Sequence, residues 1–549
     1  MRSIIFRWVM RFAAAAAGIT LLFSIILPWI NGAEYEINTA DERYTVNAVT
    51  DTINVWSPYA FSADTQPDGE NDVMSFVKYI ELMSATGGNA ELDPFVDPSD
   101  RTTKTDYDFS RIIGSCRGIL NLGAKPLIKL GNVPMKLSAE PLIGAFGVNV
   151  RPPEDYNEWY RFICDYVGAL VDEFGLSEVQ SWRFGLLTEF ENADWFYAGD
   201  KDPELSKEAY CKLYDYTVKA LTDILGNDVY IGAHAMAATE GIWDEREFIR
   251  HCAEGTNYAT GEKGTRICYL AASHYDGSVE ASADMTPAET IEHLRSAAEE
   301  YGLYNLHYGI DEGRIYGGAD GKDDRQLLSR AVGYNIQAAY DAKQYIEFAE
   351  NDIDYFSSWG YTTGSSVWGY PSLSYYTAQC FAKMAGAKAV GITANASKLP
   401  KVETGALAAK KDGTLYIMAY NYKQRIKYSL KSNTVFKIDV PEFQGKTVEI
   451  KKYLIDSDAN FFDEWQSDRL KYGILKNSFS WSPDDFALDS DTTLCGERAK
   501  KIYREQLREK YKQCAVLDCT AETVEVDGEL VLKNATDPNT VVFYEISVK

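Results

Sequence analysis

The sequence predicts an α/β fold, a (β/α)8 TIM barrel, followed by an all-β sandwich as an accessory domain. Up to about residue 395, short apolar runs alternate with amphipathic helical patterns, which is the rhythm of a parallel sheet with crossover helices. After Ala394 the helical patterns give way to strand patterns separated by turn signals. The 549 residues also exceed what one ordinary domain requires.

Eight candidate barrel strands follow one another along the chain. Each is a short run rich in apolar residues, and eight such strands with helices between them over about 340 residues fit one barrel with insertions. We expect them at Thr52–Trp56, Phe76–Met83, Lys125–Leu130, Ser181–Leu187, Val229–Ala233, Ile267–Ser273, Leu306–Ile310 and Tyr355–Trp359.

Helical periodicity fills the gaps between these strands. The expected helices are Asp108–Leu122, Asp155–Phe174, Lys207–Leu225, Pro287–Tyr301 and Asp324–Asn351. The expected strands of the accessory domain are Leu415–Asn421, Thr434–Val440, Thr447–Leu454, Thr523–Leu532 and Val541–Val548. Asp412-Gly413 and Asp527-Gly528 are typical of hairpin turns, and one charged helix is expected near Gly496–Tyr511.

The chain thus divides into a leader at 1–33, a barrel at 34–395 and a β-domain at 396–549. In the leader, three arginines precede an apolar run from Phe12 to Ile30. This pattern is typical of a signal peptide or of an N-terminal membrane anchor. Either one predicts that the rest of the chain is extracytoplasmic, secreted or tethered to the membrane.

Charge and composition exclude several classes of partner. The net charge of −26 repels phosphate backbones, so no nucleic acid partner is expected. The nine cysteines form no CxxC pair and the five histidines form no HExxH motif. We therefore expect no metal site and no cofactor. The aromatic content of 13% suits a carbohydrate site, but it suits a large core equally well.

Two glutamates follow predicted strands at the catalytic edge of the barrel. Glu189 comes just after the fourth strand and Glu312 just after the seventh. Active sites of TIM barrels lie at the carboxyl ends of the strands. A protonated carboxyl group and an ionised one, on opposite sides of the mouth, suit glycoside hydrolysis. Either glutamate alone could merely complement a helix N-terminus, so the hypothesis depends on the pair.

Several separate segments resemble glycoside hydrolase family 39. They are Tyr107-Asp108-Phe109, Leu122-Gly123-Ala124-Lys125-Pro126-Leu127-Ile128, Val133-Pro134, Val179-Gln180-Ser181-Trp182-Arg183-Phe184, His274-Tyr275, Ile310-Asp311-Glu312, and Ile455-Asp456-Ser457-Asp458-Ala459-Asn460 with Trp465. The segments occur in the order typical of the family. That family includes β-xylosidases and α-L-iduronidases, in a clan of retaining (β/α)8 enzymes.

The resemblance implies a role for each site residue. Glu189 would be the general acid/base and Glu312 the nucleophile of a covalent glycosyl–enzyme intermediate. His274 and Tyr275 would line the subsite of the cleaved sugar, with the tyrosine bonded to the nucleophile. Trp359 would lie under the sugar ring, although ordinary packing at the barrel rim would explain it equally well.

Two positions depart from the family pattern. Thr188 stands where the clan usually has an asparagine that holds the sugar 2-hydroxyl. Lys129 stands where the family usually has an acid, and with Arg314 it could bind an anionic sugar. Lys129 could instead pair with an acidic neighbour.

The sequence therefore leaves more than one class of function open. The leading hypothesis is a retaining glycosidase of the β-xylosidase or iduronidase type with a carbohydrate substrate. The alternative is a carbohydrate-binding surface protein with weakened catalysis, which Thr188 motivates. A structural cell-envelope protein is a third class, supported only by the apolar leader. The oligomeric state stays open.

Overall fold

The computed structural model describes most of the chain. The described residues are 32–66, 75–276, 285–315, 335–358, 371–396, 402–423, 430–461, 464, 467–468, 471–472 and 497–549. The predicted leader lies outside these ranges except for its last two residues. Among the described helices, none combines the length and the apolar character that crossing a membrane requires.

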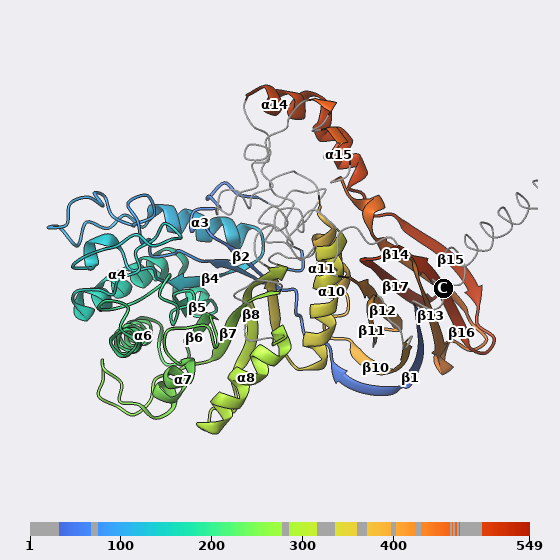
Figure 1. Cartoon of the computed structure of the whole chain (residues 1–549), viewed down its shortest axis with the longest axis horizontal. Coiled ribbons are helices and arrows are strands. Elements are labelled where there is room, and N and C mark those ends of the chain that lie inside the picture. Colours follow the sequence, from blue (N-terminus) through green and yellow to red (C-terminus); the bar gives the residue numbers. More distant parts are fainter. Residues whose placement is uncertain are drawn as a thin grey trace, which may run out of the picture.

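Eight parallel strands form a nearly closed barrel (Figure 1). They are β2 (Thr52–Val55), β3 (Tyr79–Leu82), β4 (Lys125–Leu130), β5 (Arg183–Leu186), β6 (Tyr230–Met236), β7 (Tyr269–Asp276), β8 (His307–Ile315) and β9 (Tyr355–Ser358). The first and last strands approach each other, because the Phe356 amide donates to the Val49 carbonyl at 2.9 Å. The predicted fold class is confirmed, and each strand overlaps its predicted range.

Helices cover the outside of this barrel. They are α3 (Ser110–Asn121), α4 (Tyr156–Phe174), α5 (Leu176–Val179), α6 (Pro203–Leu225), α7 (Glu245–Glu254), α8 (Pro287–Glu300), α10 (Asn335–Glu350) and α11 (Leu373–Ala382). Local signals start the longer helices: Asp155 caps α4 and Asp202 caps α6, each accepting a backbone N–H of the first turn. The sequence did not predict α7, whose ten residues present too short an apolar pattern.

A second, mixed sheet of nine strands forms the β-domain. Its members are β1 (Ala33–Thr45), β10 (Lys388–Ala396), β11 (Glu403–Lys411), β12 (Thr414–Tyr422), β13 (Ser432–Asp439), β14 (Thr447–Ile455), β15 (Cys519–Glu525), β16 (Leu530–Thr536) and β17 (Thr540–Val548). The sheet folds over on itself, since Phe436 of β13 and Tyr544 of β17 contact at 6.0 Å between ring centroids although they are not neighbours in strand order. This two-layered arrangement buries a separate core.

The sheets divide the chain differently from the predicted boundary at 395. All but one residue of β1 and all but one of β10 fall within the range assigned to the barrel, yet the two strands pair with each other and β1 also pairs with β13. Alternating burial of Ala33, Tyr35 and Ile37 gives β1 one face for the β-domain core. Helices α10 and α11 lie between the two sheets in Figure 1. There Tyr340 of α10 contacts Tyr422 of β12 at 5.9 Å between ring centroids.

One of the two predicted hairpins is correct. Asp412-Gly413 connects β11 to β12 with both residues at positive φ, as a type I′ turn requires. The prediction for Asp527-Gly528 is wrong: β15 pairs with β14, whereas β16 pairs with β13 at the other end of the strand order. The two strands therefore belong to opposite edges of the sheet. The charged helix near Gly496–Tyr511 is confirmed by α14 (Glu497–Ile502) and α15 (Arg508–Cys514).

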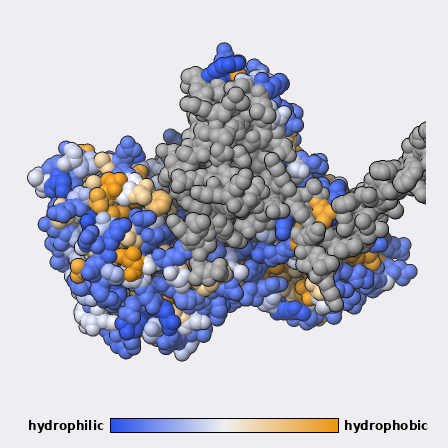
Figure 2. Space-filling view, viewed as in Figure 1, coloured by the Kyte–Doolittle hydropathy of each residue, from blue (hydrophilic) through white to orange (hydrophobic). Residues whose placement is uncertain are grey.

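The described residues on the face shown in Figure 2 are mainly hydrophilic, in keeping with the excess of acidic residues. The described cysteines are all free thiols.

Candidate active site

Glu189 stands at the carboxyl end of β5, in a backbone conformation that few residues adopt. Its φ is 42° and that of Leu187 is 53°; such left-handed residues cost on the order of 1–3 kcal/mol and gather at functional sites. The Glu189 amide donates to the Ala235 carbonyl of β6 at 2.8 Å. The strand end is thereby fixed to its neighbour, and the side chain is half-buried at the mouth.

The Glu189 carboxyl group has a raised pKa. Burial is the main cause, the nearby Glu312 adds to it, and together they raise the pKa to about 8. Hydrogen bonds from Ser273, Trp195 and Asn192 oppose this rise. A carboxyl group of this kind stays protonated near neutral pH, as a general acid must.

Glu312 lies on β8, directly after a β-bulge. In the register of β7 with β8, Ala272 faces Ile310 and Ser273 faces Glu312, so Asp311 is the extra residue. A bulge re-aims the side chains beside it. The Glu312 carboxylate accepts a short hydrogen bond from the Tyr275 hydroxyl, the partner that the family resemblance implies for the nucleophile.

The pKa of Glu312 is raised less than that of Glu189. Burial raises it to about 7, and the Tyr275 hydrogen bond and the Lys129 charge oppose that rise. The two carboxyl groups therefore differ in their surroundings: a hydroxyl donor and a cation favour the ionised form of Glu312, whereas the groups that oppose the rise at Glu189 are neutral donors. Double displacement needs a difference in this direction.

Lys129 and Thr188 form a buried pair beside these glutamates. The Lys129 ammonium donates to Thr188 Oγ1 at 2.5 Å, and it lies 5.8 Å from the ring centroid of Trp56 and 6.0 Å from that of Trp195. Burial lowers the pKa of Lys129 to about 8 against the opposing attraction of four carboxyl groups, of which Glu81 is the strongest. Because an ammonium only donates, Thr188 Oγ1 is the acceptor and its own hydrogen points elsewhere.

His274 is not brought to the two glutamates. Its Nδ1 is 3.1 Å from Thr290 Oγ1 on α8, and burial lowers its pKa to about 4. Its neighbours Ser273 and Tyr275 bond to the glutamates, so strand alternation turns His274 to the opposite face.

Trp359 and Arg314 complete the set of predicted site residues. Trp359 lies outside the described residues. For Arg314, only the backbone in β8 is described.

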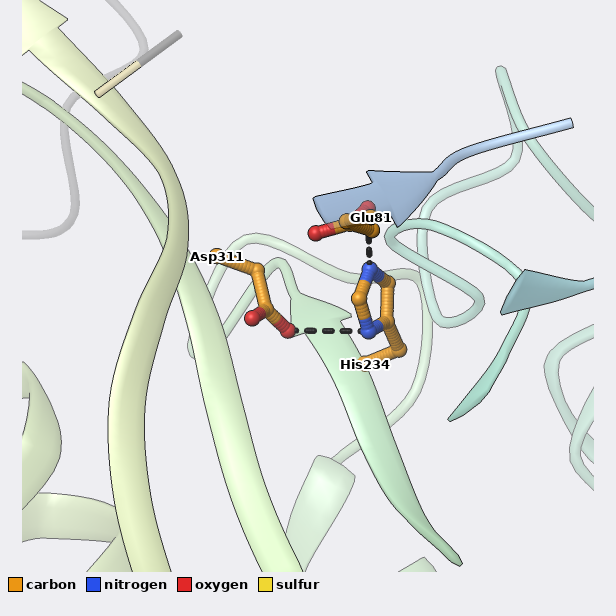
Figure 3. Close-up of side chains that lie close together, drawn as sticks. All are labelled: Glu81, His234 and Asp311. Carbon is orange, nitrogen blue, oxygen red and sulfur yellow. Dashed lines mark hydrogen bonds and ion pairs between the residues drawn. The ribbon is translucent and has the colours of Figure 1, made fainter. Parts of the chain in front are cut away.

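A further pair of carboxylates surrounds a histidine that was not among the predicted site residues. Figure 3 shows the His234 ring of β6 between Glu81 of β3 and Asp311 of β8. Nε2 is 2.7 Å from Glu81 Oε1 and Nδ1 is 3.0 Å from Asp311 Oδ2, and all three side chains are fully buried. A histidine inside an otherwise apolar strand was the available signal.

Among the described residues, these three offer their ligand atoms within 4.8 Å of one another, as a metal site would. Burial lowers the pKa of His234, but Asp311 and Glu81 outweigh it and raise the pKa to about 9. A metal ion needs an unprotonated ring nitrogen. Both ring nitrogens face carboxylate oxygens instead, so the geometry favours a hydrogen-bonded imidazolium over a ligand.

Comparison with known proteins agrees with this geometry. Residues 96–302 match the family model of the glycosyl hydrolases family 39. Family 39 is thus the family to which this part of the barrel is similar. A β-xylosidase from Caldicellulosiruptor saccharolyticus is 26% identical over 196 residues, which are 35% of this chain and 38% of that protein. An α-L-iduronidase from Mus musculus is 23% identical over 157 residues, 27% of this chain and 23% of that protein.

These matches cover less than two-fifths of each curated relative. A crystal structure of a monomeric β-xylosidase from Caulobacter crescentus superposes with a TM-score of 0.65 over 94% of this chain and 99% of that chain, at 16% identity. At that identity the superposition shows the fold alone, a barrel together with a β-domain.

Proposed function

We propose that the protein is a retaining glycoside hydrolase in which Glu189 is the acid/base and Glu312 the nucleophile. In the first step Glu312 attacks the anomeric carbon, the glycosidic bond breaks, and Glu189 gives its proton to the leaving oxygen. In the second step Glu189 takes a proton from water, which attacks the anomeric carbon and releases Glu312.

The observation that carries this proposal is the different surroundings of two carboxyl groups, one at the carboxyl end of β5 and one on β8. The Tyr275 hydroxyl donates to the Glu312 carboxylate, and the Lys129 charge also favours its ionised form. Burial raises the pKa of Glu189, and the groups that oppose this rise are neutral hydrogen-bond donors. An ionised nucleophile beside a protonated acid is the arrangement that retaining hydrolysis requires.

The test is a panel of aryl glycosides assayed with the wild type and with Glu312→Gln and Glu189→Gln. We expect Glu312→Gln to lose activity on every substrate. Glu189→Gln should lose far more activity on a substrate with a poor leaving group than on one whose leaving group needs no proton. Glu312→Gln rates equal to wild type would refute the mechanism, and sugar binding without any turnover in the wild type would favour the carbohydrate-binding alternative.

For the substrate, we propose a neutral sugar, of the kind that β-xylosidases such as the C. saccharolyticus relative act on. Among the described side chains the centre of the site holds four acidic groups against the two basic groups Lys129 and His234; the acidic groups are Glu81, Glu189, Asp311 and Glu312. A uronate carboxylate would enter a region that already has an excess negative charge. Comparing aryl β-xyloside with aryl α-L-iduronide tests this, and faster hydrolysis of the iduronide would contradict it.

We also propose that the protein acts outside the cytoplasm. The support is the arginine-flanked apolar run Phe12–Ile30. Cell fractionation of the full chain, with N-terminal sequencing of the mature protein, tests both export and cleavage.

A further inference from the structure

His234 links two strands that each contain a β-bulge, β6 and β8, which both pair with β7. In the register of β6 with β7, two residues of β6, His234 and Ala235, oppose one residue of β7. Asp311 is likewise the extra residue of β8 against β7. The hydrogen bond from His234 to Asp311 thus joins two bulges that occupy different strands of the same barrel.

The bulge on β6 frees backbone groups that bind both catalytic strands. The Ala235 amide donates to Asp311 Oδ2 at 3.1 Å, and Asp311 directly precedes Glu312. The Ala235 carbonyl accepts the Glu189 amide at 2.8 Å. Ala235 itself has φ of 39°, a conformation that needs support from its surroundings. One residue therefore bridges the backbone of the acid/base and the neighbour of the nucleophile.

The side chains around His234 can hold the imidazole in one orientation. Each ring nitrogen faces a carboxyl oxygen, of Glu81 at Nε2 and of Asp311 at Nδ1, and the charges and hydrogen bonds of these two groups raise the pKa of His234 to about 9. The geometry therefore favours a hydrogen on each ring nitrogen. The Tyr269 hydroxyl, 3.4 Å from Nδ1, donates to the Phe184 carbonyl. The Asp311 carboxylate also accepts a hydrogen bond from the Tyr355 hydroxyl, in addition to its bonds with His234 and the Ala235 amide.

We propose that His234 is a positioning residue for the hydrolysis proposed above. As a buried imidazolium between Glu81 and Asp311, it holds the bulge of β6 and the bulge of β8 in a fixed relative position. Glu189 is thereby held in place relative to Glu312. It touches neither the substrate nor the reacting atoms. Its effect passes through Asp311 to Glu312 and through Ala235 to Glu189. This inference rests on the proposed function.

The first experiment needs no catalysis. Isotope labelling of the histidines, followed by NMR titration of the full chain, reports the charge of each ring. We expect one ring, lost in His234→Gln, to stay protonated at about pH 8, well above the ordinary histidine value of about 6.5. If all five histidine rings were neutral at that pH, the proposal would be overturned even without a folded variant.

The second experiment compares kinetics in His234→Gln, Glu81→Gln and the control His293→Gln. His293 also bonds a glutamate, Glu245, at 2.5 Å, but on the outside of the barrel and partly exposed. We expect His234→Gln to lower kcat about 10- to 100-fold with KM nearly unchanged, since small misplacements of catalytic groups cost rates of that order. Glu81→Gln, which keeps an acceptor for Nε2, should lie between His234→Gln and wild type.

The outcomes separate the two proposals. If the wild type hydrolyses glycosides and a folded His234→Gln has the wild-type kcat and pH profile, this inference fails while the proposed function stands. If the wild type hydrolyses nothing in the panel, the proposed function fails and the positioning role fails with it. Equal losses in His234→Gln and His293→Gln would show a general effect on folding and would also overturn the inference.

Discussion

The hydrogen bond from Tyr275 to Glu312 allows a quantitative prediction. Tyr275→Phe removes one hydroxyl and leaves the ring in place. A hydrogen bond to a charged group contributes about 1.5–3 kcal/mol, and about 1.36 kcal/mol corresponds to a tenfold change in proton affinity. The pKa of Glu312, about 7 in the wild type, should therefore rise by about 1 to 2. It would then reach or pass the pKa of Glu189, which is about 8.

The consequence is a loss of the pH range in which Glu312 is ionised while Glu189 is protonated. At a pH below both pKa values, the ionised fraction of Glu312 falls about tenfold each time its pKa rises by about 1, so kcat/KM at about pH 6 should drop about 10- to 100-fold. The maximum should move to higher pH. The assay is the pH profile of kcat/KM on one aryl glycoside, with the exposed Tyr304→Phe as the matched control. An acidic limb that does not move would refute the idea that Tyr275 stabilises the Glu312 carboxylate.

Two further predictions concern buried charges. Lys129→Met removes a cation that lowers the pKa of Glu312, so the acidic limb of the kcat/KM profile should again move to higher pH. Urea unfolding should show a free energy of unfolding lower by about 3–5 kcal/mol, because the buried carboxyl groups lose their cation. A variant with the stability and the pH profile of the wild type would contradict this. Glu191 is buried and its pKa is raised by burial to about 8, so the native state holds its proton more tightly than the unfolded chain. Stability should therefore fall as pH rises from about 4.5 to about 8, by up to about 1.4 kcal/mol for each pH unit. Glu191→Gln should have the melting temperature of the wild type near pH 5 and a higher one near pH 9. Equal melting temperatures of variant and wild type at both pH values would show that Glu191 does not cause the loss of stability.

The elements that could be predicted from the sequence are those with a local cause. Buried parallel strands are short apolar runs that end in turn residues, and for this reason Lys125–Leu130 was predicted with its true bounds. The two glutamates of the candidate site were found because TIM barrels place chemistry at strand ends. Period-two alternation would also have shown that Tyr275 and His274 cannot both face Glu312.

The features that were missed depend on pairing between distant segments. Strand β1 pairs with β13, about four hundred residues later in the chain, and no local pattern shows which sheet a strand joins. The same holds for Asp527-Gly528, where the turn signal is present but each flanking strand finds a better partner elsewhere. The bulges at Asp311 and at His234 arise from the register between neighbouring strands, which a single strand sequence does not contain.

The surroundings of Glu189 and Glu312 differ in the charge that they contain. Lys129 and His234 are both among the groups that lower the pKa of Glu312. The groups that oppose the rise in the pKa of Glu189 are neutral hydrogen-bond donors, Ser273, Trp195 and Asn192. Neutral donors stabilise a carboxylate less than a buried cation does. The positive charge beside Glu312 thus supports the proposed roles of acid and nucleophile, and the Lys129→Met variant tests that support directly.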